Sequence, residues 1–369
     1  MKHELSMLEL LVLAKELNAV KGYHIDQFYQ LGERRFRIRL SSREGKVNLN
    51  IEVPDYIALS SSGEVSEEAT GLAMAVRKRV SGARITGVSL LNNDRIIRIA
   101  FDRKESGGNI ILEMFGRGNL IITDDKMEIS LALQTHEFAD RSVRKGETYK
   151  PPKSETVELT DMKAVDGVFG SIGTAQGSDR LIAYLSRRLG LGAMYIDDAI
   201  RRQKLDPKVK IKDVDRKSLD GIRRRVAGIL ENSGSSILYL RDGKPEDVAL
   251  AEIEKYSGLE MRRMPLNEAV EALYTSSPRA ETEKSADVER LEASISRQEE
   301  IIGKMGVEEA ECRAKGDFIS ANVTKIGALI KAASDKRVGE DELAKVAGGI
   351  KVKRIDRAKR AITIEVEER

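Results

Sequence analysis

The sequence is poor in the residues that build several common kinds of functional site. Its 369 residues include one cysteine, three histidines and no tryptophan, and aromatic residues make up 4%. The single cysteine, Cys312, excludes a disulfide framework and a zinc site built from several cysteines. The histidines lie far apart without metal-ligand spacing, and few aromatic rings are present to stack on unpaired bases. We therefore expect no metal and no cofactor.

Long apolar runs are also absent. No stretch reaches the length that spans a membrane, and the N-terminus lacks the charged-then-apolar pattern of a signal peptide. No glycine-rich nucleotide-binding loop of the Walker type occurs. These absences predict a soluble cytoplasmic protein without a membrane partner.

Charged residues, by contrast, are abundant. They make up 33% of the chain, above the usual share of about 25%, and most of the excess lies beyond residue 140. Such an excess is typical of long exposed helices. Because the net charge is only +3, binding to nucleic acid would depend on local basic clusters. The length suits two or three domains.

The first 158 residues predict a domain of mixed helices and strands. Apolar residues at helical spacing begin near Ser6, and Glu9 follows three residues later as in a capping box. Alternating apolar and polar residues predict strands with one face toward water. Strands are expected at 36–40, 47–51, 96–101, 109–115, 120–123 and 129–134, and a further helix at 71–80. This order indicates an α+β fold with an antiparallel sheet.

A second domain is expected at 159–280, after a basic, proline-containing linker at 140–158. Residues 166–231 have a helical pattern. Residues 236–240 predict a short strand, and 266–274 predict a helix. The domain is therefore expected to be helical with a strand–helix extension.

Residues 281–369 predict a coiled-coil arm. Six residues follow the spacing of a heptad seam, with glutamine at one position. They are Val288, Leu291, Ile295, Gln298, Ile302 and Met305. An amphipathic helix that folds back on the body is the alternative. Strands are expected at 350–355 and 361–366 in place of a returning helix, so we expect a truncated arm whose seam can pair between chains.

The stretch 189–208 is the most specific local motif. It contains Gly190 and Gly192 before a helix and Asp206-Pro207 after it, and it resembles the helix-two-turns-helix element of the formamidopyrimidine-DNA glycosylases. A glycine-flanked helix start suits an anion, although an ordinary helical hairpin with glycine hinges fits the residues as well. The resemblance implies an N-terminal sheet domain of the glycosylase type followed by a helix-two-turns-helix domain.

The chemistry of those glycosylases is not expected. In that family an N-terminal proline acts as nucleophile, whereas this chain begins Met1-Lys2-His3-Glu4. One cysteine cannot form the family's four-cysteine zinc finger, and Ala193 stands where the family has a phosphate-facing asparagine. We predict that the protein is not an enzyme.

Five blocks in order resemble the NFACT family, which includes bacterial RqcH, its archaeal relatives and the eukaryotic nascent-chain tailing factors. They are the opening helix at 8–17, the helix at 73–78, the turn at 93–97, the strand pair at 113–124 and the exit at 144–152. The family architecture joins this domain to a helical domain and a long coiled-coil arm. A C-terminal RNA-binding domain and the arm's return helix would be missing here.

The resemblance implies a tRNA-binding site at Asp94, Arg95 and Glu9. The family's Asp-Arg pair is implicated in holding tRNA, and Glu9 stands where the family has an aspartate. An arginine can bind phosphate or a guanine edge with two hydrogen bonds, and a carboxylate can accept from cytosine or orient the arginine. The residues alone also fit a solvated pair in a hairpin turn, and Glu9 also fits a helix start.

Further residues are candidate contacts to RNA phosphates. They lie on the predicted helix 71–80, in the turn around Gly118 and in the domain exit, where Arg79 and Arg141 belong to the same basic clusters. Solvated surface and plain turn chemistry are the alternatives. The candidates are Arg77, Lys78, Arg117, Asn119, Arg144 and Lys145.

By this resemblance, the chain is expected to act in ribosome-associated quality control. Such a factor binds tRNA, by resemblance tRNA-Ala, on a large ribosomal subunit that still holds peptidyl-tRNA. It supports template-free C-terminal tailing of the stalled chain, while the ribosome makes the peptide bond. Two alternatives stay open: an inactive nucleic-acid-binding protein of the glycosylase fold, and a fibronectin-binding or scaffold protein.

Overall fold

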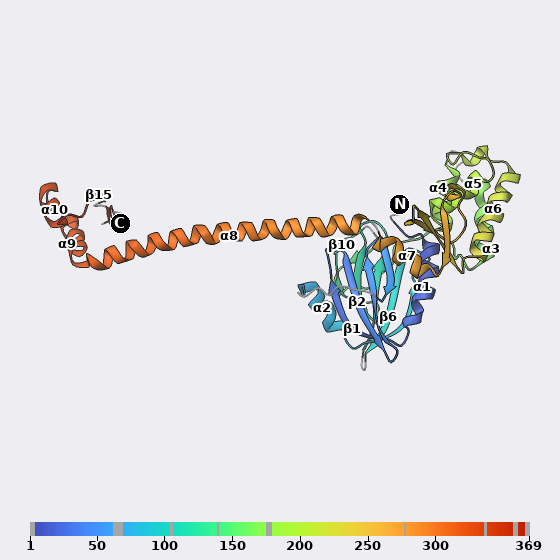
Figure 1. Ribbon diagram of the computed structural model, residues 1–369, viewed down its shortest axis with the longest axis horizontal. Helices are drawn as coiled ribbons and strands as arrows, with labels where there is room; N and C mark the ends of the chain where they lie inside the picture. Colours follow the sequence, from blue (N-terminus) through green and yellow to red (C-terminus); the bar gives the residue numbers. More distant parts are fainter. Residues whose placement is uncertain are drawn as a thin grey trace. The chain divides into compact units, whose positions relative to one another are not determined.

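The structure is a computed structural model with two compact units, Met1–Ala280 and Glu281–Arg369 (Figure 1). It describes residues 4–61, 69–103, 106–138, 140–174, 179–276, 278–335, 338–356 and 361–365, and leaves the side chains of 173–174, 278–293, 340–342 and 344 undescribed. The division of the first unit at residue 158 stays a prediction.

A nine-stranded antiparallel sheet forms the base of the first unit. Its strands follow the order β4-β3-β2-β1-β5-β6-β7-β8-β9, and β1 meets β5 at the pair His24 and Arg84. Two runs of neighbouring strands are therefore joined at one point. The strands are β1 (His24–Gln30), β2 (Arg35–Ser42), β3 (Gly45–Glu52), β4 (Tyr56–Ser60), β5 (Arg84–Leu90), β6 (Ile96–Arg103), β7 (Ser106–Glu113), β8 (Asn119–Asp124) and β9 (Ile129–Ala132).

The burial of these strands follows their sequence pattern only in part. In β2, Phe36, Ile38 and Leu40 are buried while the intervening arginines are half-buried, so the predicted alternation is confirmed there. Strand β7 differs, because six consecutive residues at its end are buried. A second cluster that includes Val143 and Tyr149 covers its other face. The prediction of one wet face is therefore wrong for this part of the sheet.

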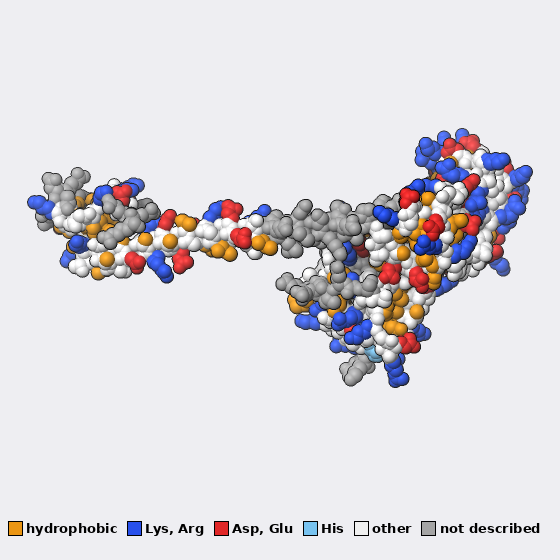
Figure 2. Space-filling view, in the orientation of Figure 1, with side chains coloured by type: hydrophobic (Ala, Val, Ile, Leu, Met, Phe, Trp, Pro, Cys, Tyr) orange, Lys and Arg blue, Asp and Glu red, His pale blue; other side chains and the backbone are white. Residues whose placement is uncertain are grey.

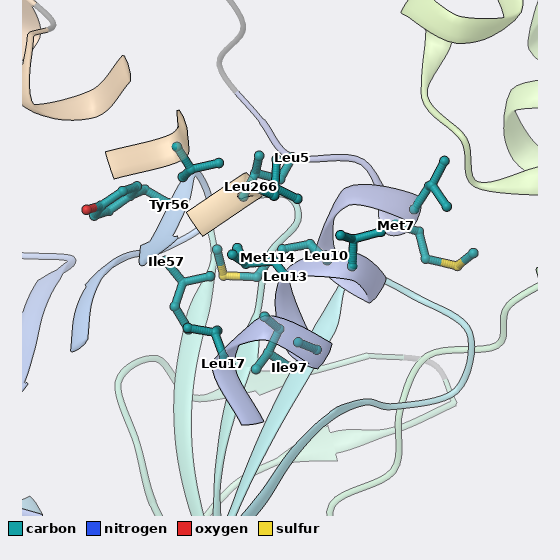
Figure 3. Packing of buried hydrophobic residues seen from close by; sticks show 14 of the residues in the cluster. Leu5, Met7, Leu10, Leu13, Leu17, Tyr56, Ile57, Ile97, Met114 and Leu266 are labelled. Carbon is teal, nitrogen blue, oxygen red and sulfur yellow. The ribbon is translucent and has the colours of Figure 1, made fainter. Parts of the chain in front are cut away.

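Two helices pack on the sheet. Helix α1 (Met7–Leu17) packs on β5, and α2 (Gly71–Val80) packs on β1. Both predicted helices are confirmed. Figure 3 shows Leu10, Leu13 and Leu17 of α1 turned toward buried residues of the sheet and toward Leu266. A short hairpin of β10 (His136–Glu137) and β11 (Ser142–Val143) follows the sheet.

The helical part of the first unit shares the core of the sheet, because one buried cluster runs from Leu5 to Leu273. The predicted helical stretch 166–231 consists of four α-helices in the described residues, separated by turns. They are α3 (Met162–Gly170), α4 (Leu181–Leu189), α5 (Ala193–Arg201) and α6 (Arg216–Glu231). A three-stranded sheet and one helix follow: β12 (Ser236–Arg241), β13 (Lys244–Ala249), β14 (Glu260–Met264) and α7 (Leu266–Thr275). Single-turn 3₁₀ helices are η1 (Asn18–Val20), η2 (Ser171–Thr174), η3 (Ile211–Asp213) and η4 (Glu254–Tyr256).

The second unit is built on α8 (Pro278–Ala321), which has 44 residues and is about 66 Å long at 1.5 Å per residue. Of the predicted seam, Ile295, Ile302 and Met305 are exposed, and the side chains of Val288 and Leu291 lie outside the described residues. Two shorter helices follow that the sequence did not predict as separate elements, α9 (Val323–Ser334) and α10 (Glu340–Ala347). The two predicted C-terminal strands are found as a hairpin of β15 (Val352–Asp356) and β16 (Ala361–Ile364), which shares a small core with these helices.

Candidate functional site

The start of α1 is fixed by a reciprocal cap. Ser6 Oγ accepts from the backbone N–H of Glu9 at 3.3 Å, and the Glu9 carboxylate accepts from the backbone N–H of Ser6 at 2.8 Å. The predicted capping box is therefore confirmed. The carboxylate of Glu9 is fully buried, so it faces no solvent.

The turn between β5 and β6 holds the predicted Asp-Arg pair. Asn92 and Asn93 have φ of 61° and 47°, a left-handed conformation that asparagine tolerates better than most residues. One carboxylate oxygen of Asp94 accepts from the backbone N–H of Arg95 at 2.7 Å. The Arg95 guanidinium forms an ion pair with Glu4, and its side chain is 27% exposed. The arginine is therefore oriented but still reachable from solvent.

The turn between α4 and α5 packs against the start of α1. Gly192 has φ of 88°, and a Cβ at this position would lie 2.9 Å from the Cβ of Ser6. The carbonyl of Gly190 accepts from the backbone N–H of Met7 at 3.1 Å. The glycines of the motif thus permit close approach of two helices, while the first N–H groups of α5 remain without intrahelical partners.

A buried tyrosine joins these segments. The Tyr195 hydroxyl donates to Glu9 at 2.5 Å and accepts from the backbone N–H of Leu250 at 2.9 Å. Burial, followed by the nearby Glu9 carboxylate, raises the pKa of Tyr195 well above its usual value. The hydroxyl therefore keeps its proton, and Glu9 is held by α5 as well as by its own helix.

The three segments enclose an open cleft of about 470 Å³. Its charged lining comes from Glu4, Asp94, Arg95 and Arg187, and the start of α5 at Ala193 lines another side. A guanidinium beside a helix N-terminus suits an anion, and the carboxylates suit amino or hydroxyl donors. The cleft therefore offers cationic donors for an anion and carboxylate acceptors for amino or hydroxyl groups.

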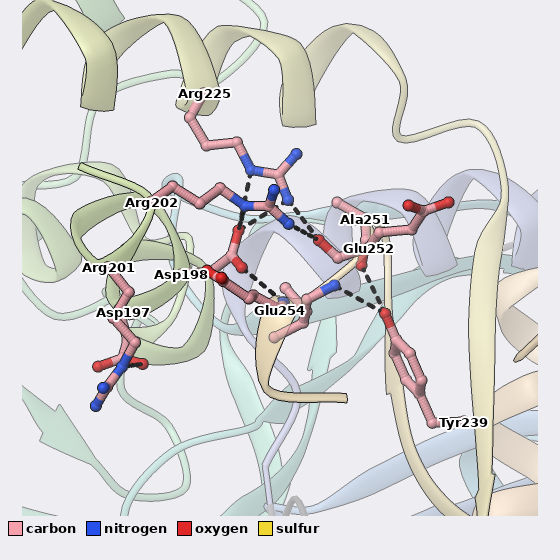
Figure 4. A network of polar contacts seen from close by, with 10 residues as sticks. Asp197, Asp198, Arg201, Arg202, Arg225, Tyr239, Ala251, Glu252 and Glu254 are labelled. Carbon is pink, nitrogen blue, oxygen red and sulfur yellow. Dashed lines mark hydrogen bonds and ion pairs between the residues drawn. The ribbon is translucent and has the colours of Figure 1, made fainter. Parts of the chain in front are cut away.

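An ion network holds α5 on the side of the cleft (Figure 4). The side chain of Asp198 is fully buried and accepts from Arg202 at 2.9 Å and from Arg225 of α6 at 2.8 Å. Its other oxygen accepts from the backbone N–H of Glu254 at 2.9 Å. Both arginines also donate to the carbonyl of Glu252. One carboxylate thus ties α5 to α6 and to the segment after β13.

The predicted phosphate contacts on α2 and near Gly118 lie outside the residues that line the cleft. Arg77 is half-buried and donates to the carbonyl of Phe28 at 2.8 Å, whereas Lys78 and Arg117 are exposed. Asn119 is buried, and its side chain pairs with the backbone of Gln134 at 2.9 and 3.0 Å. Asn119 therefore stabilises the turn, and its side chain is not presented to solvent.

The basic residues of the domain exit also include both exposed and buried side chains. Arg144 and Lys145 are exposed, and Arg144 pairs with Glu137 at 2.6 Å. Arg141 is buried and pairs with Glu113 at 2.5 Å, so it is a structural residue. Among the described residues, no cluster of three or more metal-binding side chains occurs, and no helix has the length and apolar content to cross a membrane.

Comparison with known proteins identifies the family. The sequence matches the family described as NFACT N-terminal and middle domains over residues 7–367. The chain belongs to the NFACT family. It is 23% identical over 354 residues to the archaeal Rqc2 homolog aRqcH of Methanocaldococcus jannaschii, covering 91% of this chain and 53% of that protein. It is 24% identical over 226 residues to human ribosome quality control complex subunit NEMF, covering 58% of this chain and 21% of the human protein.

This NFACT chain spans about half the length of the archaeal relative and less of the human one. Its fold is similar to that of the N-terminal part of the fibronectin/fibrinogen-binding protein from Streptococcus suis, with a TM-score of 0.59 and 18% identity. That similarity covers 74% of this chain and all, 100%, of the other. At this identity it shows the fold alone, and it confirms the α+β class.

Three residues of the NFACT cleft were missed at the sequence level: Glu4, Arg187 and Tyr195. Glu4 was considered only as part of an N-terminal sequence that lacks the glycosylase proline. Arg187 precedes the helix-two-turns-helix motif at 189–208. Tyr195 stands inside the motif, but its partner Glu9 is 186 positions away. Only the fold brings these two residues together.

Proposed function

We propose that this NFACT chain acts in ribosome-associated quality control in the cytoplasm. It binds tRNA and the obstructed large ribosomal subunit, and supports template-free tailing of the stalled nascent chain without catalysing a reaction itself. The family match over nearly the whole chain and relatives named for ribosome quality control support this proposal. The single observation that carries the tRNA-binding part is the cleft where Asp94 and Arg95 meet the starts of α1 and α5.

Arg95 is the proposed contact to tRNA phosphate or to a guanine edge. Its guanidinium is partly exposed and is paired with Glu4, which is itself 44% exposed. A tRNA phosphate competes with this carboxylate for the same donors, and an exposed pair of this kind is weak enough to be exchanged. Asp94 fixes the backbone from which Arg95 extends.

Glu9 takes a positioning role in this proposal. Its carboxylate is fully buried and bound by Ser6 and Tyr195, so it has no solvent-facing edge for a direct contact to tRNA. It acts by holding α1 against α5, which sets the width of the cleft. Among the other candidates, Lys78, Arg117, Arg144 and Lys145 have exposed side chains and are proposed as salt-sensitive contacts to RNA.

The test compares two double variants of one hairpin. Asp94→Ala/Arg95→Ala removes the cleft pair, and Arg84→Ala/Asp102→Ala removes an exposed cross-strand pair at the other end of the same β5–β6 hairpin. Both variants lose one acid and one base. Affinity for purified tRNA, in particular tRNA-Ala, and for large ribosomal subunits would be measured for each.

The cleft variant is expected to lose about ten- to a hundredfold in tRNA affinity, because charge-assisted hydrogen bonds contribute about 1.5–3 kcal/mol. The control should bind tRNA as the unmodified chain does. Equal tRNA binding by all three proteins would contradict the proposed site and return Asp94 and Arg95 to turn chemistry.

A further inference from the structure

A second charged surface lies beyond the C-terminal end of α5, whereas the cleft is at the N-terminal end of that helix. Residues 204–217 run from the turn after α5 into the first turn of α6 and contain six basic and three acidic side chains. Their net charge of +3 equals that of the whole chain. Figure 2 shows Lys and Arg side chains gathered along the outer edge of the helical part, over α5 and α6.

Exposed lysines alternate with apolar residues that pack on the core along residues 208–212. Lys208, Lys210 and Lys212 are exposed, while Val209 and Ile211 between them pack on the core. Lys208 lies in a turn, Lys210 has extended backbone dihedrals, and Lys212 lies in the single-turn helix η3. The three lysines therefore project into solvent within five consecutive residues.

The backbone of this segment is firmly held. The backbone of Lys210 forms an isolated antiparallel β-bridge with that of the exposed Arg180. Across this junction, the backbone N–H of Leu181 donates to the carbonyl of Val209 and that of Ile211 donates to the carbonyl of Asp179, at 3.0 Å each. The bridge therefore brings a further cation beside the lysines. A fixed backbone lowers the entropy lost when several side chains bind one ligand.

Two of the three acidic residues of the segment serve the local fold. Asp206 accepts from the backbone N–H of Lys208 at 2.7 Å, and Asp215 caps α6 by accepting from Ser218 at 2.9 Å. The hydrogen bonds from Ser218, first from its backbone N–H and then from its side chain, lower the pKa of Asp215 below its usual value. The basic side chains have no such role, because none of the six forms a salt bridge within the part of the chain that the structure describes.

Two of the cations stand where a helix alone would disfavour them. Arg216 and Lys217 occupy the first turn of α6, where the partial positive charge of the helix repels a cation. Both side chains are exposed. An anionic ligand would relieve this repulsion and would be attracted by the lysines as well.

We propose that these residues, the α5–α6 basic surface, bind the phosphate backbone of double-helical RNA without reading its sequence. The surface consists of Lys204, Lys208, Lys210, Lys212, Arg216 and Lys217. Residues 204–217 contain no aromatic side chain, so single-stranded bases find no ring to stack on. Lysine is a point charge that suits phosphates rather than base edges. The inference rests on the proposed function and assigns part of the contact with ribosomal RNA to a surface separate from the cleft.

The test uses two triple variants of the 369-residue chain. Lys208→Gln/Lys210→Gln/Lys212→Gln neutralises the surface, and Lys21→Gln/Lys126→Gln/Lys244→Gln neutralises three exposed lysines elsewhere in the first unit. Both change the net charge equally. Binding to a short RNA duplex of mixed sequence, to large ribosomal subunits and to poly-glutamate would be measured across a salt series, with thermal unfolding as a check on folding.

We expect the surface variant to lose about tenfold or more in affinity for the duplex. The slope of log affinity against log salt concentration should become shallower by about two to three, since each lost phosphate contact removes about 0.9 from this slope. Duplex binding equal to that of the control variant would overturn the inference. A loss for poly-glutamate as large as that for RNA would also overturn it, because the partner would then be an acidic protein. Either result leaves the tRNA test of Asp94 and Arg95 unaffected, since those residues lie in the cleft.

Discussion

At the scale of single residues, Glu9 separates what a sequence pattern can predict from what a fold decides. Its spacing from Ser6 predicts a capping box, and the hydrogen bonds confirm it. The resemblance to the NFACT family implies a tRNA contact at the same position, yet the carboxylate is fully buried against Tyr195. No local pattern could place these side chains together, because their contact depends on the packing of α5 on α1.

Replacement of Tyr195 by phenylalanine tests this positioning role. The change leaves the buried Glu9 carboxylate short of one donor and the backbone N–H of Leu250 without its acceptor. We expect a loss of about 1–3 kcal/mol in the free energy of unfolding, measured by urea denaturation, and weaker tRNA binding. Tyr184→Phe is the control, because its hydroxyl contacts Ser171 at 3.0 Å in a half-buried place. Equal effects of the two changes would refute the role given to Tyr195.

At the scale of elements, the predicted strands are those with a clear apolar alternation. Strand β2 alternates apolar and basic residues, and β3 alternates apolar and polar ones, so both could be placed. Strand β14 could not, because all of its residues but the last are exposed and it is bound to β12 through backbone hydrogen bonds. Strand β1 mixes polar and apolar residues and carries an irregularity between Ile25 and Gln27. Because its apolar residues do not alternate regularly, β1 could not be predicted from the sequence.

The carboxylate of Asp198 contributes more to the placement of α5 than that of the adjacent Asp197. Asp197 and Asp198 each pair with an arginine four residues later, but Asp197 is partly exposed and Asp198 is fully buried. We expect Asp198→Ala to cost about 3–5 kcal/mol in unfolding free energy, because two arginines lose their buried partner. Asp197→Ala should cost about 0.3–0.5 kcal/mol. Urea denaturation of both variants measures the two losses in unfolding free energy. Losses of similar size would contradict the role given to the Asp198 network.

At the scale of the whole molecule, the net charge conceals how the charges are distributed. A net charge of +3 does not by itself indicate a nucleic-acid binder, yet residues 204–217 alone carry this net charge, and the cleft places Arg95 and Arg187 near a helix start. The order of units also follows the sequence: sheet, helices, then the long helix α8. What composition could not indicate is which cations are free, since Arg141 and Arg225 serve the fold while Lys78 and Lys145 are exposed.

The central claim is that tRNA enters the cleft between the β5–β6 turn and the start of α5. A photo-crosslinking amino acid at Ala193, which is exposed and lines the cleft, tests it most directly. The same group at the exposed Lys126, in the turn between β8 and β9, is the control. After irradiation with tRNA-Ala, we predict a crosslink from position 193 that Asp94→Ala/Arg95→Ala abolishes, and none above background from position 126. Equal crosslinking from both positions, or a crosslink at 193 that the double variant leaves unchanged, would contradict the account.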